Sequence, residues 1–179
     1  VRSYTYLYPL DKHDVDTFWT SPDMQAESAR AMVDLGFTAV KFDPAGPYTM
    51  RGGHMPAKSD IDLSTRMCAA IRDAVGNNVD LLFGTHGQFS TAGAIRMGRA
   101  LEPYDPLWYE EPVPPDNTGS MSKVAQSVRI PIATGERLTT KAEFAPVLRE
   151  GAATILQTAL GRSGGILETK KIAAMAEAY

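Results

Sequence analysis

The 179-residue sequence contains one cysteine, Cys68, so a disulfide framework is excluded and a small core residue is expected there rather than a nucleophile. No apolar run approaches the length of a membrane span, and no secretory signal pattern opens the chain. The net charge of −3 gives no electrostatic reason to expect nucleic acid or a membrane surface as partner. The glycine pairs Gly52-Gly53 and Gly164-Gly165 lack the G-x-G-x-x-G spacing of a nicotinamide site. The absence of a disulfide framework fits a reducing cytoplasm best.

A regular alternation of strand and helix patterns fills the chain, and its 44% hydrophobic and 22% charged residues suit an ordinary globular core. Several strand patterns are nearly continuous apolar runs, as in Leu81-Leu82-Phe83, which is typical of strands buried on both faces. We expect strands at about 2–7, 38–43, 80–85, 106–111, 130–134 and 153–158. We expect helices at about 22–36, 59–75, 91–102, 118–128, 139–149 and 164–178.

This alternation predicts an α/β fold with a parallel sheet, either doubly wound or closed as a barrel. A complete (β/α)8 TIM-type barrel needs about eight units, and we count about six here. Val1 begins directly on a strand pattern, and Tyr179 ends a helix pattern without a glycine cap. We therefore expect residues 1–179 to be a partial catalytic barrel domain, truncated to about six βα units, with two units beyond Tyr179.

Glu110 and Glu136 each follow an apolar strand pattern, about one βα unit apart. In a barrel this spacing puts both acids at the C-terminal mouth, where barrel enzymes carry their chemistry. Adjacent carboxylates repel unless a positive charge lies between them, and a hard divalent cation is the usual solution. A glutamate at a strand end can also be a surface acid or a helix cap, but the matched positions favour a metal site. Glu111 is a candidate for a structural ion pair.

Lys41 and Asp43 alternate on the second strand, so both should point the same way, and His86 follows the third strand. A cation at the mouth could bind a substrate carboxylate and stabilise the dianion formed when the neighbouring proton leaves. Lys41 could remove that proton or hold the carboxylate. His86 could act as acid or base on the next carbon, or hydrogen-bond loop backbone. Asp43, before Pro44, could be only a turn residue.

A long segment rich in glycine and proline, Pro44 to Asp60, follows the second strand. A long loop on the C-terminal side of a barrel strand is more often a lid or specificity loop than a passive connection. Arg51 and His54 on this loop are therefore candidate substrate-binding residues, although either could be solvated. His13 is expected at the surface.

Five motifs together resemble the enolase superfamily. They are K-x-D on the second strand, G-T-H-G-Q on the third, Y-E-E-P-V on the fourth, T-G-E-R on the fifth and G-G-I-x-E-x-K-K-I-A on the sixth. The sequence is most similar to the mandelate racemase/muconate lactonizing group, and within it to galactonate-dehydratase-like enzymes. The resemblance implies Mg²⁺, a Lys or His base and an enediolate. It also implies a separate N-terminal capping domain outside this chain and a homo-oligomeric assembly.

By this resemblance Glu110 and Glu136 match the second and third metal ligands, and Lys41 matches the first lysine of the family's K-x-K motif. His86 matches the histidine that acts as general acid on the departing hydroxyl. The family's first metal-ligand aspartate falls on Gly84, and its place would be taken by Asp43, or alternatively by His86 or water.

Two further positions depart from the family pattern. Asp43 stands where the family has its second lysine, and Ala159 stands where an aspartate orients a second catalytic histidine. The expected function is an Mg²⁺-dependent dehydratase of a galactonate-like sugar acid, acting by α-proton abstraction and β-elimination. The alternatives are a cycloisomerase or racemase that uses the same enolate, and a non-catalytic protein on a decayed barrel.

Overall fold

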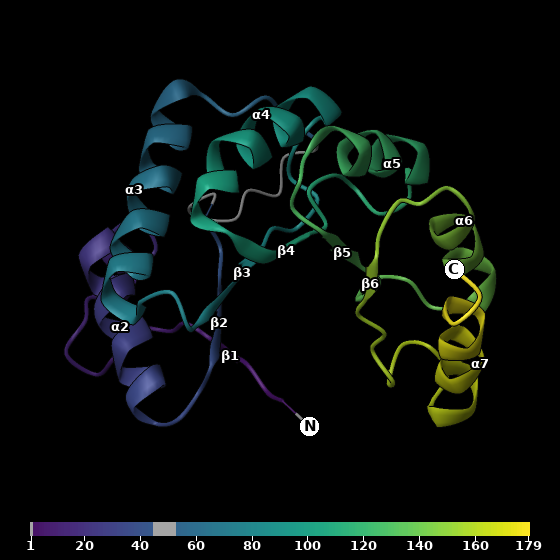
Figure 1. The fold of residues 1–179 in the computed structure, drawn as a ribbon, viewed down its shortest axis with the longest axis horizontal. Coiled ribbons are helices and arrows are strands. Elements are labelled where there is room, and N and C mark those ends of the chain that lie inside the picture. Colours follow the sequence, from purple (N-terminus) through teal and green to yellow (C-terminus); the bar gives the residue numbers. More distant parts are fainter. Residues whose placement is uncertain (1, 45–52) are drawn as a thin grey trace.

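The computed structural model describes residues 2–44 and 53–179, which form a curved sheet of six strands flanked by helices (Figure 1). The strands follow one another in sequence order, and each neighbouring pair is parallel. They are β1 (Thr5–Tyr6), β2 (Ala39–Phe42), β3 (Asp80–Gly84), β4 (Pro106–Glu110), β5 (Ile132–Thr134) and β6 (Ile155–Leu156). This order is what a barrel wall built from successive βα units requires.

Helices connect the strands and lie along the convex outer side of the sheet (Figure 1). The α-helices are α1 (Val15–Phe18), α2 (Pro22–Asp34), α3 (Lys58–Val75), α4 (Thr91–Leu101), α5 (Thr118–Ser127), α6 (Lys141–Arg149) and α7 (Ile166–Ala176), and η1 (Glu102–Tyr104) is a short 3₁₀ helix. The predicted alternation of strands and helices is confirmed. The short α1 and η1 were not predicted from the sequence.

Local side chains explain where the helices begin and end. The Ser21 hydroxyl accepts a hydrogen bond from the Met24 backbone N–H, which caps the start of α2. Gly36 follows the end of this helix with φ +98°, a conformation that residues with a Cβ seldom adopt. At the start of α6, the Glu143 carboxylate accepts from the Thr140 N–H at 2.8 Å, as its capping-box spacing predicts.

The two faces of the sheet bury different sets of side chains, because alternate residues of a strand point to opposite sides. The outer face packs against the helices and forms the main core, which includes Phe42, Leu81, Phe83, Tyr109 and Ile132. Cys68 of α3 is fully buried in this core, as expected. The inner face carries a smaller apolar cluster of Ala39, Leu82, Trp108 and Ala133, with Ile155 packed against it.

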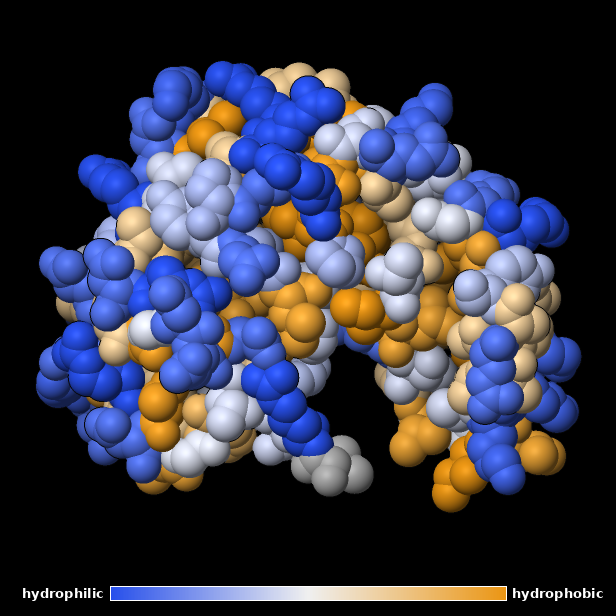
Figure 2. Space-filling view, in the orientation of Figure 1, coloured by the Kyte–Doolittle hydropathy of each residue, from blue (hydrophilic) through white to orange (hydrophobic). Residues whose placement is uncertain are grey.

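The sheet bends into an arc whose hollow side opens between β1 and α7 (Figures 1 and 2). Among the described residues, β1 and β6 each pair with one strand only. None of the helices in the described part of the chain is both long enough and apolar enough to cross a membrane.

The expected surface position of His13 is wrong. Its side chain is only 4% exposed, with Nε2 2.7 Å from Glu27 Oε2. The imidazole also stacks on the buried Phe18 ring, with centroids 5.8 Å apart. This aromatic packing and the carboxylate explain why a histidine in a polar segment lies inward.

Candidate active site

Polar side chains gather where the strands end, on the inner face of the arc. Lys41 lies two residues after Ala39, Glu110 two after Trp108 and Gln157 two after Ile155. Each therefore continues the inward-facing row of its strand beyond the apolar cluster. In the pairing of β3 with β4, Glu110 lies directly beside Gly84. Because the strands are parallel, their carboxyl ends meet at one edge, as at the mouth of a barrel.

Glu110 is the centre of a buried hydrogen-bonded cluster. Its Oε2 atom lies 2.6 Å from Lys41 Nζ and 2.9 Å from the Nε2 atom of Gln157. The Glu110 and Lys41 side chains are 2% and 11% exposed. The Thr85 hydroxyl donates to the Glu110 carbonyl and fixes the backbone there. A buried carboxylate requires such compensation, because an unpaired charge in this environment is costly.

Gly84 provides the space through which Lys41 reaches Glu110. A Cβ atom on Gly84 would lie 2.7 Å from Lys41 Cε and 3.5 Å from Tyr6 Cε2. Such a distance is too short for two carbon atoms, so any larger residue here would push the lysine stem aside. The absence of a side chain at position 84 is therefore coupled to the position of Lys41.

Asp43 and His86 form a second pair beside this cluster. His86 Nδ1 lies 3.3 Å from Asp43 Oδ2, and their side chains are 36% and 7% exposed. The hydrogen bond to Asp43 raises the pKa of His86, against a smaller opposing effect of burial. The charges of Glu136 and Glu110 raise it further. The sequence predicts that Asp43 and His86 lie at this edge of the sheet, and in the structure their side chains are in contact.

Tyr6 of β1 also belongs to this site, although it was not identified from the sequence. Lys41 Nζ lies 5.6 Å from the centroid of its ring. Burial raises the pKa of Tyr6, and the charges of Asp43, Glu110 and Glu136 add to that effect. The charges of Asp43, Glu110 and Glu136 thus all disfavour ionisation of the Tyr6 phenol. The alternation Tyr4-Tyr6-Tyr8 was the signal that this strand presents aromatic side chains to one face.

Glu111 forms an ion pair, one of the roles considered for it. Its Oε2 atom lies 2.6 Å from Arg137 Nε, and its Oε1 atom accepts from the Thr134 hydroxyl at 3.2 Å. Burial raises the pKa of Glu111, and Arg137 opposes that shift. The Glu111 backbone has φ 35°, an uncommon conformation for a non-glycine residue. This pair links the end of β4 to the turn after β5.

The two candidates on the long loop have different outcomes. Arg51 lies outside the described residues. His54 lies against the loop between β3 and α4. Its backbone N–H donates to the Gln88 carbonyl at 3.0 Å, and its backbone carbonyl accepts from the Ser90 N–H at 2.9 Å. Its imidazole packs near the Phe89 ring, with centroids 5.5 Å apart. The loop that leaves β2 therefore returns beside the loop that carries His86.

The carboxylates at the mouth suit a hard cation in their chemistry. Asp43, Glu110 and Glu136 offer oxygen atoms, which Mg²⁺ prefers, and Glu136 is partly exposed. Within residues 2–44 and 53–179, however, no three His, Cys, Asp or Glu side chains lie close enough to hold an ion. Lys41 Nζ is the positive charge that contacts Glu110 in this arrangement. The three carboxylates are therefore chemically suited to Mg²⁺, but in this structure Glu110 is ion-paired with Lys41.

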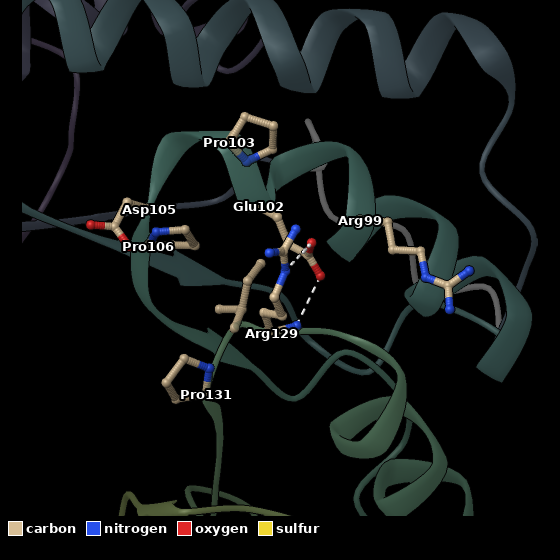
Figure 3. A pocket seen from close by; sticks show the side chains of 8 residues that line it. Arg99, Glu102, Pro103, Asp105, Pro106, Arg129 and Pro131 are labelled. Carbon is tan, nitrogen blue, oxygen red and sulfur yellow. Dashed lines mark hydrogen bonds and ion pairs between the residues drawn. The ribbon is translucent and has the colours of Figure 1, made fainter.

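A hollow of about 390 Å³ lies at the other end of the strands (Figure 3). Its wall includes Pro106, the first residue of β4, and Pro131, which directly precedes β5. Arg129 and Glu102 pair across it, with Arg129 Nε 3.2 Å from Glu102 Oε2. In barrel enzymes this N-terminal end contributes to stability rather than to chemistry, so the candidate site is the opposite edge.

The parallel βα wall and the carboxylates at its carboxyl edge define a protein of the barrel-enzyme class. The chain belongs to the enolase C-terminal domain-like family, whose model matches residues 23–179.

Relatives with known names are similar over most of this chain. D-galactonate dehydratase of Ralstonia nicotianae is 44% identical over 183 aligned residues, covering 100% of the chain and 47% of that protein. D-gluconate/D-galactonate dehydratase of Picrophilus torridus is 39% identical over 158 residues, covering 88% of the chain and 39% of that protein. The chain thus spans less than half the length of these curated relatives.

Solved structures agree with this assignment. The mandelate racemase/muconate lactonizing enzyme-like protein from Roseovarius sp. TM1035 is 73% identical and superimposes with a TM-score of 0.97. The match covers 100% of this chain and 45% of that one. The predicted fold class and superfamily are therefore confirmed.

Proposed function

We propose that this chain is part of a dehydratase that removes water from a galactonate- or gluconate-like sugar acid. The observation that carries the proposal is the cluster of Lys41, Glu110 and Gln157 at the carboxyl edge of the sheet, with Asp43 and His86 beside it. Such a cluster can bind an acid and exchange protons on neighbouring carbons. The names of the relatives support the sugar-acid class.

Each polar residue has a proposed role in this reaction. Lys41 contacts the acid end of the substrate in one of two roles. As an ammonium it binds the substrate carboxylate, and as a neutral amine it removes the α-proton. His86, oriented by Asp43, donates a proton to the departing hydroxyl. Arg51 and His54 on the long loop bind the remainder of the substrate. The product is a 2-keto-3-deoxy acid.

We further propose that Glu110, Glu136 and Asp43 hold Mg²⁺ when the enzyme is loaded. Bound there, the cation would accept the substrate carboxylate and stabilise the negative charge that develops as the α-proton leaves. The support is the oxygen character of the three side chains and their positions at or just after the carboxyl ends of β2, β4 and β5.

The test is a panel of sugar acids with Mg²⁺, offered to the full-length protein, with detection of 2-keto product. We expect turnover of a galactonate- or gluconate-like acid that a chelator abolishes. Glu136→Gln should weaken Mg²⁺ binding, and His86→Ala should remove dehydration while Mg²⁺ binding persists. Normal Mg²⁺ affinity and turnover in Glu136→Gln would show that the metal assignment is wrong.

Product analysis separates this function from the related reactions of the same enolate. An isomer or lactone in place of a 2-keto acid would identify a racemase or cycloisomerase. Binding of Mg²⁺ without any turnover on the panel would also favour those reactions, whereas absence of both would identify a non-catalytic barrel.

The wider setting is part of the proposal. We place the enzyme in the cytoplasm as a homo-oligomer, with residues 1–179 as part of its barrel domain and a capping domain and two further βα units elsewhere in the protein. Light scattering of the full-length protein measures the assembly.

A further inference from the structure

Gln157 occupies an unusual place in the mouth cluster. It follows β6, yet its Nε2 atom donates to Glu110 Oε2 of β4, at 2.9 Å, so its side chain crosses the end of β5. The crossing is possible because β5 presents Ala133 and then Gly135 in its inward row. Gly135 has φ +130°, and a Cβ there would lie 3.2 Å from the Gln157 backbone nitrogen. The small residues of β5 thus open a path from β6 to Glu110.

The orientation of the Gln157 amide follows from its partner. An ionised carboxylate only accepts hydrogen bonds, so the NH₂ end of the amide must face Glu110. The reverse orientation would place the amide oxygen against the carboxylate oxygen, and both are acceptors. Lys41 Nζ, which donates to the same Glu110 oxygen, holds that carboxylate in place.

The other end of the amide is a buried acceptor. Among the described residues, Gln157 Oε1 is out of contact with solvent and has no hydrogen-bond donor. A buried acceptor without a donor costs about 1–3 kcal/mol, so such a group calls for a physical explanation. Here the acceptor lies on the side chain that contacts the central carboxylate of the candidate site.

We propose that Gln157 is a substrate-binding residue whose Oε1 atom accepts a hydrogen bond from a substrate hydroxyl close to the acid end of the sugar chain. This inference rests on the proposed function and adds a specificity element to it. A site built to bond a hydroxyl strongly rejects the analogue that lacks it, because the protein acceptor then stays unpaired. Gln157 would therefore select polyhydroxy acids over acids without a hydroxyl at that carbon.

The test compares wild type and Gln157→Met in the full-length protein. Dissociation constants are measured calorimetrically for D-galactonate, D-gluconate and their analogues lacking the hydroxyl at carbon 2, 3 or 4. We expect Gln157→Met to weaken binding of the preferred parent acid about tenfold, the size of one hydrogen bond. For one deoxy analogue, wild type and variant should bind alike, because that analogue has already lost the same bond.

Gln25 provides a matched control. It is a buried glutamine of α2 whose Oε1 also lacks a donor among the described residues, and its Nε2 faces the Phe18 carbonyl at 3.5 Å. Gln25→Met should leave the ratio of parent to deoxy affinities unchanged. If Gln157→Met does not fold, Gln157→Asn, which is one methylene shorter, should give the same ratio change.

The outcomes separate the two proposals. Equal weakening for the parent and every deoxy analogue would show that Gln157 acts only through Glu110, and would overturn the inference while the proposed function stands. Unchanged binding in Gln157→Met would overturn it as well. A wild-type protein that neither binds nor converts any sugar acid would overturn the proposed function, and this inference with it.

Discussion

At the scale of single residues, Gly84 and Lys41 depend on one another. The lysine stem occupies the space that a side chain at position 84 would fill, and its ammonium neutralises the buried Glu110. A larger residue at 84 and the ion pair are therefore incompatible, although the two positions are 43 residues apart in sequence.

Gly84→Ala should test this dependence. The new Cβ would meet the flexible end of Lys41 at 2.7 Å, so the lysine moves aside and the backbone stays. We expect a stability loss of about 1–3 kcal/mol, typical of overpacking, and a fall in turnover. Gly119→Ala is the control, because a Cβ there meets its nearest neighbour only at 3.9 Å. Thermal unfolding and steady-state kinetics of both variants measure the difference, and unchanged turnover in Gly84→Ala would contradict the dependence.

Lys41→Met should increase the affinity for Mg²⁺ while abolishing activity. Removing the ammonium leaves Glu110 without its resident positive charge, so a divalent cation gains attraction and loses a competitor. We expect Mg²⁺ to bind about tenfold or more tightly, while turnover disappears. Calorimetric titration with Mg²⁺ measures the first effect. Weaker Mg²⁺ binding in the variant would show that Lys41 assists the metal rather than competing with it.

Arg137→Met should expose the cost of the buried Glu111 carboxylate. Loss of one partner of a buried pair costs about 3–5 kcal/mol, and we expect the lower end because Arg137 is partly exposed. Burial raises the pKa of Glu111 and Arg137 opposes that rise, so without Arg137 the folded state binds the Glu111 proton more tightly than folded wild type does. The stability difference from wild type should therefore shrink as the pH falls from about 7 to about 5. Urea unfolding at several pH values measures this trend, and a constant difference would refute it.

The sequence predicts some of these residues and misses others for physical reasons. Lys41, Asp43, His86 and Glu110 could be placed together because the ends of parallel strands must meet at one edge. The Lys41–Glu110 ion pair could not be predicted, since it depends on the space at Gly84 and on the path of one flexible side chain.

Gln157 escaped notice for a related reason. Its contact with Glu110 crosses the end of β5. Nothing in the sequence of β6 indicates that β5 has only small residues on its inward face at that position. Arrangements of this kind depend on neighbouring elements rather than on the strand that carries the residue.

At the scale of elements, Arg72 of α3 joins three parts of the fold. Its guanidinium donates to the carbonyls of Gly76 and Val79, at 2.9 and 2.7 Å, and to the Tyr104 carbonyl at 3.0 Å. These acceptors lie after α3, before β3 and at the end of η1. One side chain thus fixes how the helix turns into the strand and how the next unit approaches.

Arg72→Met should loosen this junction. The variant keeps most of the apolar stem but leaves these carbonyls, and that of Asp105, without the Arg72 donor, and we expect a loss of about 2–3 kcal/mol. The exposed Arg66 of the same helix gives the control, Arg66→Met, with a change within about 0.5 kcal/mol. Chemical denaturation of the two variants compares them. Similar losses for both would show that helix propensity or charge, and not the junction, is responsible.

The elements themselves could be predicted closely, because buried parallel strands and amphipathic helices have distinct periods. The strand ends were less predictable. The first strand was expected over about 2–7 and pairs only at Thr5–Tyr6, because the ladder forms only where β2 lies alongside. The helix α1 was missed because it has four residues, too few to show a period.

At the scale of the whole molecule, the fully buried Cys68 reports on the integrity of the core. Burial raises the pKa of its thiol, so the reactive thiolate is scarce in the folded chain. We expect a thiol reagent to modify the chain only through unfolding, at a rate that increases with denaturant. A Cys68→Ser, Ser59→Cys variant, with the thiol at an exposed position of α3, should react at once. Rapid labelling of native Cys68 would mean that the α3 side of the core opens locally.

The order of the strands has a further consequence for how the protein is made. Every strand pairs with its neighbour in sequence, so each βα unit can dock on the preceding one as it leaves the ribosome. The residues of the candidate site are then synthesised in sequence order. Lys41 and Asp43 emerge first, His86 next, then Glu110 and Glu136. Gln157 arrives last and closes the cluster by reaching back across β5. Until then, the Glu110 carboxylate lacks the hydrogen bond from Gln157, so the cluster is completed only after β6 has been made.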